Sequence, residues 1–383
     1  MRNWLLPEHI ADILPATARQ VESAKAAMLE QFRTAGYELV SPPLIEYIEA
    51  LVSEDDGALD IKTFKLDDHL SGRQLGLRAD ITPQVARIDA HLLSERTGVT
   101  RLCYAGSVVH ARPNGLMSSR EPLQVGAELY GYAGIEADLE VIGLMLDALR
   151  LGGVENIRLD VGHIAIFRGL VAAAALDATS ARELFAALQS KDGATIRELV
   201  AGVAEPYRSA FIALPELYGP ASMLESARSR LPSLPEIELG LMQLSAIARA
   251  LQGKVELSFD LAELRSGFYH TGLLFTAYAP GWSDALARGG RYDNVGRRFG
   301  RARPATGFSL DLRDLIRILP ARHPARGIRV AARQLPDASN EVARLRATGE
   351  IVVLDYLGES AEALGCDREL VATSEGWQIV PFH

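Results

Sequence analysis

Residues 289–312, GGRYDNVGRRFGRARPATGFSLDL, join two adjacent glycines to a run of arginines and then to an apolar segment. The final ATGFSLDL has the β-branched and apolar content of a strand, and residues 311–319 continue with a helical pattern. Gly289 and Gly290 fit either a tight turn or a wall that a ligand approaches closely, because glycine has no side chain to obstruct either. The stretch therefore predicts a strand that leads into a helix, beside a turn or a ligand site.

Residues 72–131 have the pattern of antiparallel strands around a helix. The strands are expected in the apolar runs 73–79, 101–109 and 123–131, and the helix at 83–94. This region includes two further informative stretches, LRADITPQVAR at 77–87 and VVHARPNGLMSSREPLQVGAELYG at 108–131. Gln124 and Glu128 fall on one face of the last predicted strand, because side chains alternate along a strand. Solvent would cover such a polar face unless it belongs to a binding site.

The remainder of the chain indicates an α+β protein. Amphipathic helices are expected at 17–35 and 136–151, strands at 255–264 and 269–278, and helices through most of 168–250. We therefore predict an antiparallel sheet flanked by helices for residues 1–320, with 168–250 as a helical insertion. Residues 321–383 begin with a linker and predict a small C-terminal α/β domain, because short apolar strands flank a helix there.

Composition and charge exclude several classes of protein. The 383 residues include 40 basic and 49 acidic side chains, a net charge of −9, so no overall positive field favours nucleic acid or a membrane surface. The arginines from Arg297 to Arg303 are interpreted as a loop or a partner contact, with RNA as the weaker alternative. Cys103 and Cys366 fit a reduced protein without disulfides, and no spacing typical of metal ligands is present. We expect a cytoplasmic protein, because we find no export signal and no membrane-spanning apolar stretch.

The three quoted stretches together bring one family to mind. In order and spacing, residues 77–87, 108–131 and 289–312 resemble the histidine pocket, motif 2 and motif 3 of class II histidyl-tRNA synthetases. LRSGFYHTGLLF at 264–275 resembles the histidine-specific signature of the same enzymes. The resemblance covers roughly residues 5–320 and implies the class II aminoacyl-tRNA-synthetase fold, an antiparallel sheet flanked by helices.

The resemblance assigns eight residues to histidine binding. Asp80, with Thr82 beside it, would hold the α-ammonium group, and Arg265 would reach the carboxylate or phosphate region. Tyr269 and His270 stand where the family has a tyrosine pair at the imidazole ring. The eight residues are Asp80, Thr82, Gln124, Glu128, Arg265, Tyr269, His270 and Tyr292.

Ordinary structural roles are open for the same residues. Asp80 fits a cap for the helix that follows it, and Arg265 fits a surface pair with Glu263. Tyr269 and His270 are neighbours in an extended segment, so they point to opposite faces and at most one of them contacts a ligand. We favour Tyr269 for that contact.

Two positions depart from the synthetase pattern. The family has an arginine on the ATP α-phosphate where this chain has Val109, and an arginine on the γ-phosphate where it has Asp314. Arg112 lies at an odd offset from Val109, on the other face of a continued strand, and Arg313 lies about 100° around the helix from Asp314. Neither is a natural replacement. Each charge-assisted hydrogen bond contributes about 1.5–3 kcal/mol, so the sequence predicts that amino-acid adenylation is absent.

The segment after Gly327 adds a third departure. It is shorter than the anticodon-binding domain of the synthetases and has no basic stripe. A synthetase-like core that keeps the amino-acid pocket but lacks the ATP clamp and that domain resembles the regulatory subunits of ATP phosphoribosyltransferase.

This second resemblance implies a protein without catalytic activity of its own, without cofactor or metal, and without a nucleic-acid or membrane partner. It implies a short-form ATP phosphoribosyltransferase catalytic subunit as partner, in the first step of histidine biosynthesis, and L-histidine as the feedback inhibitor. It also implies self-association as a dimer within a hetero-octamer. The alternatives are an active histidyl-tRNA synthetase and a synthetase paralogue that modifies another substrate.

Overall fold

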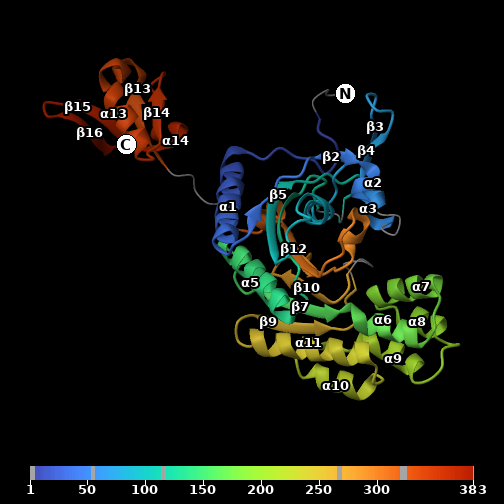
Figure 1. The fold of residues 1–383 in the computed structure, drawn as a ribbon. Helices are drawn as coiled ribbons and strands as arrows, with labels where there is room; N and C mark the ends of the chain where they lie inside the picture. The colour runs from blue at the N-terminus through green and yellow to red at the C-terminus, as the bar shows by residue number, and fades with distance from the viewer. Residues whose placement is uncertain are drawn as a thin grey trace. The chain divides into compact units, whose positions relative to one another are not determined.

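The computed structural model describes residues 5–52, 57–113, 115, 118–264, 270–319 and 326–382. Within these residues the chain divides into two compact units, and the division falls between Leu319 and Arg326 (Figure 1). Each unit has a sheet and an apolar core of its own.

The first unit is built on a mixed sheet of nine described strands, and most neighbouring strands are antiparallel. Only the pairs β1–β5 and β7–β9 are parallel among them. This arrangement confirms the predicted antiparallel sheet. In spatial order the strands are β1 (Glu38–Leu39), β5 (Thr100–Ser107), β6 (Leu123–Tyr130), β12 (Ala305–Asp311), β11 (Ala287–Arg291), β10 (Leu273–Tyr278), β7 (Arg158–His163), β9 (Glu256–Asp260) and β8 (Tyr218–Gly219).

Strand β11 was not among the strands expected from the sequence. Gly289 and Gly290 lie inside it and are paired with β10 and β12, so the turn interpretation is wrong. A Cβ atom on Gly289 would lie 2.4 Å from the carbonyl oxygen of Gly307 and 2.3 Å from the ring of Phe275. The glycines therefore allow neighbouring strands and rings to pack closely in the centre of the sheet.

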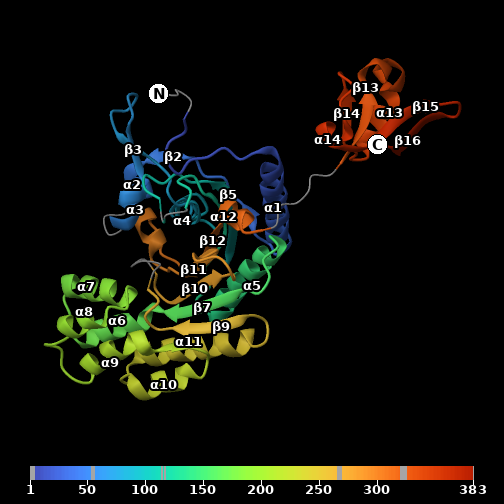
Figure 2. The ribbon, with the colours of Figure 1, turned by 180° about the vertical axis from the view of Figure 1, so that it is seen from behind.

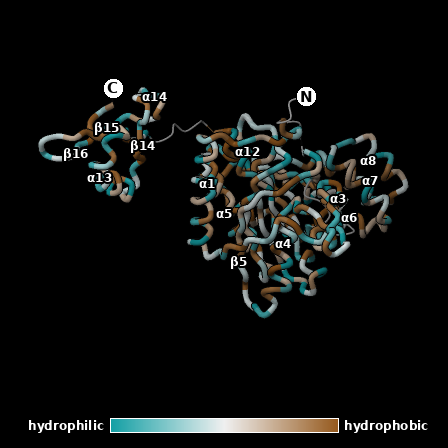
Figure 3. Tube along the Cα trace, turned by 90° about the horizontal axis from the view of Figure 1, so that it is seen from above, coloured by the Kyte–Doolittle hydropathy of each residue, from teal (hydrophilic) through white to brown (hydrophobic). Residues whose placement is uncertain are grey.

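Two long helices cover one face of this sheet. They are α1 (Pro15–Thr34), close to the predicted span, and α5 (Ile135–Leu151). The rings of Phe32 in α1 and Phe308 in β12 meet edge to face at 5.9 Å. Figure 3 shows hydrophilic and hydrophobic residues alternating along α1, as expected for a helix with one buried face.

The opposite face carries the shorter elements from the first third of the chain and from the end of the first unit. Pro42 and Pro43 separate β1, at the edge of the large sheet, from β2, because proline interrupts backbone pairing. The predicted helix at 83–94 begins as an α-helix and continues as one π-helical segment. These elements are β2 (Ile45–Tyr47), α2 (Ile48–Leu51), α3 (Gly57–Lys62), β3 (Phe64–Asp67), β4 (Gln74–Leu77), α4 (Thr82–Arg87), η1 (Ile88–Leu92) and η3 (Val295–Phe299). Helix α12 (Leu312–Arg317) instead packs into the core that α1 and α5 cover, through Leu312, Leu315 and Ile316.

A group of helices is inserted between β7 and β9 and lies at that end of the sheet in both ribbon views (Figures 1 and 2). Asp177 and Asp192 start two of these helices by accepting hydrogen bonds from backbone N–H groups of the first turn. The helices are α6 (Ile164–Ala173), α7 (Ala178–Gln189), α8 (Gly193–Leu199), α9 (Tyr207–Ala213), η2 (Leu214–Glu216), α10 (Met223–Arg230) and α11 (Pro235–Leu251). Along the described chain, no helix is long and apolar enough to cross a membrane.

The second unit is a four-stranded sheet with the order β14-β13-β15-β16. Its core packs helix α13 against the sheet through Val330, Val342 and Leu370. The expected alternation of strand, helix and strand is therefore present. The elements are β13 (Gly327–Ala331), η4 (Ala332–Gln334), α13 (Leu335–Ala347), β14 (Val352–Asp355), α14 (Ala361–Leu364), β15 (Cys366–Thr373) and β16 (Gly376–Pro381).

Candidate functional site

A cavity of about 490 Å³ lies on the sheet face opposite α1 and α5, over β6, β11 and β12. The period of two along β6 explains its polar floor. Val125, Ala127 and Leu129 point into the core beneath the helices, whereas Gln124 and Glu128 line the cavity. The expectation that Gln124 and Glu128 share one face is confirmed.

Six of the eight predicted site residues line this cavity, namely Asp80, Thr82, Gln124, Glu128, His270 and Tyr292. Arg265 and Tyr269 lie outside the described residues, so the preference for Tyr269 over His270 stays a prediction. We call the six lining residues the amino-acid side of the cavity. Their contribution to ligand binding is a prediction, but their proximity in space is an observation.

Glu128 is the most enclosed polar group of the amino-acid side, with 1% of its surface exposed. Its Oε1 accepts hydrogen bonds from Tyr104 and Thr82, both at 3.0 Å, and its Oε2 accepts one from Tyr292. Burial raises the pKa of Glu128 to about 8. Near pH 7 and without a ligand, the Glu128 carboxyl group is therefore mostly protonated.

Tyr104 and Tyr130 complete the environment of Glu128, although neither was predicted as a site residue. Burial raises the pKa of Tyr104 and Tyr292 well above 10, so both keep their protons and act as donors. The Tyr292 hydroxyl also lies 3.4 Å from that of Tyr130. In the sequence these tyrosines look like ordinary strand residues, and no local signal separates them from the core.

Asp80 lies just before helix α4 and accepts two hydrogen bonds there. Its Oδ1 accepts hydrogen bonds from the backbone N–H of Thr82 at 3.0 Å and from Gln124 Nε2 at 2.9 Å. Gln124 Oε1 in turn accepts the N–H of Ile81 at 2.9 Å. The expected N-cap role of Asp80 is not found, because Ile81 is the N-cap of α4 and no side chain of the described residues caps the helix. Asp80 instead binds the N–H of Thr82 and the Gln124 amide with one carboxylate oxygen, and it lines the cavity.

His270 and Tyr292 form an aromatic wall. Their rings meet edge to face at 6.5 Å and 88°, and His270 is 2% exposed. Strand β11 approaches this wall so closely that a Cβ atom on Gly290 would lie 2.6 Å from His270 Cδ2. A larger residue at position 290 would therefore displace the histidine.

The region that corresponds to motif 2 supplies no permanent cation to the cavity in the described chain. Val108 and His110 are among the lining residues, and Arg112 is exposed and not among them. His110 Nε2 lies 3.0 Å from the carbonyl oxygen of Ala79. Burial lowers the pKa of His110, which disfavours a positive charge on its ring.

The other end of the cavity is acidic. We call Asp284, Arg288, Asp311 and Asp314 the acidic side, and all four line the cavity. Arg288 is paired with Asp284 at 2.8 Å, and Asp314 with Arg317 at 3.1 Å. Burial and the neighbouring Asp314 raise the pKa of Asp311 to about 7. This side has more carboxyl groups than cations and is a poor environment for a triphosphate.

Arg313 does not replace the arginine that the synthetases have at the position of Asp314. It pairs with Glu121 at 3.3 Å and is not among the lining residues of the described chain. Lys62 also lines the cavity, close enough to His110 that, besides burial, its charge lowers the pKa of that ring. The described residues offer no cluster of three or more His, Cys, Asp or Glu side chains that would hold a metal ion.

The arginine run at 297–303 makes most of its contacts within the chain itself. Arg303 is 9% exposed and pairs with the buried Asp89 at 2.8 Å. Arg301 donates to the carbonyl oxygen of Ser94 at 2.7 Å. The interpretation as a solvated loop or partner contact is therefore wrong for Arg303, because a long-range buried ion pair holds it in the core.

Comparisons with known proteins first define the class. A family model described as histidyl-tRNA synthetase matches residues 9–315. A histidyl-tRNA synthetase structure from Nostoc has a TM-score of 0.80 over 100% of this chain and 97% of that chain, and at 16% identity it shows the fold alone. The first unit therefore has the class II histidyl-tRNA-synthetase fold, as predicted.

Closer relatives define the family. ATP phosphoribosyltransferase regulatory subunits from Chromobacterium violaceum, Laribacter hongkongensis and Burkholderia vietnamiensis are 80%, 65% and 52% identical, each over 100% of this chain and 100% of their own. Residues 325–380 match the model of the ATP phosphoribosyltransferase subunit HisZ C-terminal domain. A crystal structure of a regulatory subunit/histidyl-tRNA synthetase from Bacillus halodurans has 28% identity and a TM-score of 0.82, over 95% of this chain and 96% of that one. The chain belongs to the family of ATP phosphoribosyltransferase regulatory subunits.

Proposed function

We propose that this chain is a non-catalytic regulatory subunit that senses L-histidine and controls a short-form ATP phosphoribosyltransferase catalytic subunit. In this proposal the catalytic subunit condenses ATP with phosphoribosyl pyrophosphate in the cytoplasm, as the first step of histidine biosynthesis. The catalytic subunit needs this chain for activity, and histidine bound to this chain inhibits it.

One observation carries the proposal: the two ends of one cavity differ in chemistry. Carboxyl, hydroxyl, amide and imidazole groups converge on the amino-acid side, where Asp80 and Glu128 suit an ammonium group and polar ring nitrogens. At the other end Asp311 and Asp314 stand where a triphosphate would need cations. Such a cavity favours holding a free amino acid over activating it with ATP.

Regulation then requires two arrangements of the complex. The catalytic subunit is active in one of them, and histidine binds the other arrangement more tightly. A coupling free energy of about 1–3 kcal/mol would change activity by roughly 5–150-fold. No chemistry at the histidine site is needed, which fits a cavity without an ATP clamp in its described part.

Calorimetry and an activity assay test this proposal together. Histidine is titrated into the chain alone and into its complex with the catalytic subunit, and phosphoribosyl transfer is followed with and without histidine. We expect saturable binding and inhibition over the same concentration range. Absence of histidine binding in both preparations would disprove the sensing role.

We also propose that the chain self-associates as a dimer within a hetero-octamer. The edge strand β1 supports this, because it pairs only with β5 among the described strands and Leu39 is 60% exposed there. The free side of an edge strand has backbone N–H and C=O groups with which a second copy can pair. Sedimentation equilibrium of the chain alone should give twice the 41.5 kDa mass. A monomer at micromolar concentration would argue against the dimer.

An active histidyl-tRNA synthetase is the second candidate, and the family-model match over residues 9–315 favours it. Histidine-dependent exchange between pyrophosphate and ATP would establish this activity. We expect none, because Val109 and Asp314 leave both phosphate contacts of the synthetases without an arginine.

A further inference from the structure

The backbone of residues 270–272 determines where the His270 side chain lies in the cavity. His270 is held between the Tyr292 ring and the close approach of Gly290. Because Tyr292 and the backbone of Gly290 lie so close, the imidazole ring has little room to move independently of its backbone. Any movement of the backbone at 270–272 would therefore move the imidazole of His270 relative to a bound ligand.

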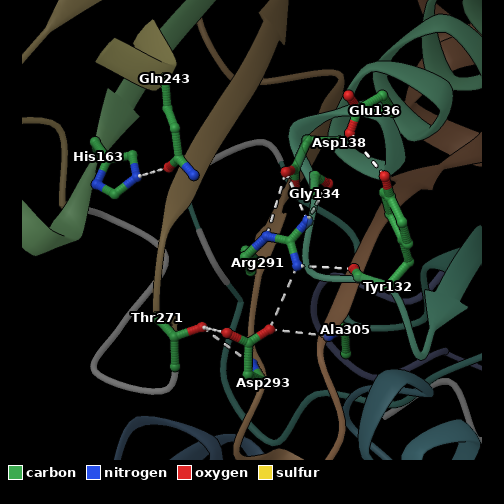
Figure 4. Close-up of polar contacts among 10 residues, drawn as sticks. All are labelled: Tyr132, Gly134, Glu136, Asp138, His163, Gln243, Thr271, Arg291, Asp293 and Ala305. Carbon is green, nitrogen blue, oxygen red and sulfur yellow. Dashed lines mark hydrogen bonds and ion pairs between the residues drawn. The ribbon is translucent and has the colours of Figure 1, made fainter. Parts of the chain in front are cut away.

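Thr271 ties this segment to the end of β11. Its Oγ1 donates to Asp293 Oδ2 at 3.0 Å and accepts from the Asp293 backbone N–H at 3.0 Å. Its own N–H donates to the carbonyl oxygen of Arg291 at 2.7 Å. Asp293 Oδ1 accepts the N–H of Ala305 at 2.9 Å, so one carboxylate connects the segment to the start of β12 (Figure 4).

Arg291 anchors this connection in the core. Its side chain is 7% exposed and pairs with Asp138 at 2.7 Å, at the start of α5. It also donates to the carbonyl oxygens of Tyr132 and Gly134 and lies 3.6 Å from Asp293 (Figure 4). Because a buried guanidinium with its donors paired is held firmly, Asp293 and the segment bonded to it have a rigid support.

The same segment is bonded to the helical insertion. The carbonyl oxygen of Gly272 accepts the N–H of Ile164, at the start of α6, at 3.0 Å. The neighbouring His163 lies 2.6 Å from Gln243 Oε1 in α11 through its Nε2 (Figure 4). Thr271 is therefore flanked by a cavity residue on one side and by a backbone link to the insertion on the other.

We propose that Thr271 and Asp293 are positioning residues for histidine binding, which act by holding His270 in its place in the cavity. Neither residue lines the cavity in the described chain. The inference rests on the proposed histidine-sensing function. It extends that function to two side chains that no ligand contact would identify.

The test measures histidine affinity in four variants. Each variant is assembled with the catalytic subunit, and histidine binding to the complex is followed by calorimetry. Thr271→Val removes both bonds of the hydroxyl while keeping the shape, and Asp293→Asn weakens them. We expect each to bind histidine about tenfold more weakly, because one or two hydrogen bonds are lost. Thr271→Ser, which keeps the hydroxyl, should restore most of the affinity. Thr276→Val, in β10 away from the cavity lining, is the matched control and should bind as the unmodified chain does.

A double-mutant cycle separates positioning from a general loss of structure. In a His270→Gln background, Thr271→Val should cost little further affinity, because the residue that it positions has already been replaced. An equal cost in both backgrounds would overturn the inference. Unchanged affinity in both Thr271→Val and Asp293→Asn, with binding by the unmodified chain, would overturn it while leaving the proposed function. An unmodified chain that binds no histidine would overturn both.

Discussion

The two ends of the cavity share the same strands and differ in what those strands present. On β12, Gly307 lies opposite Glu128 of the amino-acid side, whereas Asp311 of the acidic side lies further along the strand, opposite Gln124. At the amino-acid side hydroxyl donors surround the Glu128 carboxyl group, whereas on the acidic side carboxyl groups gather with few cations. The backbone that supports an ATP-using site can therefore be kept while side chains at a few positions decide which ligand it accepts.

This contrast also shows which end tolerates change. Glu128 is fully enclosed and bonded to three hydroxyl groups, so its replacement disturbs several partners at once. Asp284 on the acidic side forms an ion pair with Arg288, and both side chains are nearly half exposed. Mutations should accordingly be costly for ligand binding at the first end and nearly neutral at the second.

The largest effect is expected from Asp80→Ala. The change removes the carboxylate proposed to pair with the ligand ammonium and releases Gln124 and the start of α4. Loss of a charge-assisted contact of up to about 3 kcal/mol predicts roughly 100-fold weaker histidine binding and loss of feedback inhibition. Calorimetry and the inhibition assay measure this. The complex with the catalytic subunit should still assemble.

Asp284→Ala is the matched change on the acidic side. It should alter the histidine dissociation constant by no more than about twofold, since an exposed pair contributes about 0–1 kcal/mol. Equal losses in the two variants would remove the distinction between the two ends.

A somewhat smaller effect is expected from Gly307→Ala. The added Cβ would lie 1.5 Å from Glu128 Oε2, so the carboxyl group must move away from its three hydroxyl partners. Overpacking of this kind costs about 1–3 kcal/mol of stability, and we expect binding to weaken by roughly tenfold or more. Thermal unfolding and calorimetry measure the two effects. Gly143→Ala in α5, where a Cβ would meet nothing within 4 Å, should leave both unchanged or raise stability slightly.

The sequence allowed the strands and polar face of the amino-acid side to be predicted, because the signals there are local. Alternation along β6 places Gln124 and Glu128 on one face, and Asp80 sits before a recognisable helix start. Tyr104 could not be identified in the same way. It meets Glu128 only because β5 and β6 are neighbours in the folded sheet.

The acidic side and strand β11 show where prediction from the sequence failed. Gly289 and Gly290 look like a turn in isolation, and only the close packing of β10 and β12 makes them strand residues. Asp284 follows a segment with no periodicity, so nothing in the sequence indicated that it lines the cavity. The burial of Arg303 depends on Asp89, more than two hundred residues earlier in the chain, and short-range patterns do not report such pairs.

A smaller effect concerns the proton on Glu128. Its pKa of about 8 means that the carboxyl group is largely protonated at pH 7, whereas a cationic or donating ligand group favours the ionised form. Binding should therefore release protons at pH 7, and affinity should rise about fivefold between pH 7 and pH 8. Calorimetry in two buffers of different ionisation enthalpy measures the number of protons released.

Glu128→Gln should abolish this proton release, whereas the control Asp311→Asn should keep it. Proton release that persists in Glu128→Gln would mean that another group titrates.

The smallest effect is expected from Asp311→Asn, measured as stability against pH. The pKa of Asp311 is raised from 3.8 to about 7 in the folded chain, so the folded state binds more protons than the unfolded state between about pH 4 and pH 7. The free energy of unfolding should therefore fall as the pH rises through this window. Asparagine keeps an acceptor for the N–H groups of Arg313 and Leu123 but cannot ionise. The variant should lose part of the pH slope, and at pH 7.5 its unfolding midpoint should be about 2–4 °C higher. Identical slopes in the two proteins would mean that Asp311 ionises as freely as a surface carboxylate, and the acidic side would then be a solvated edge of the cavity and not a buried end of it.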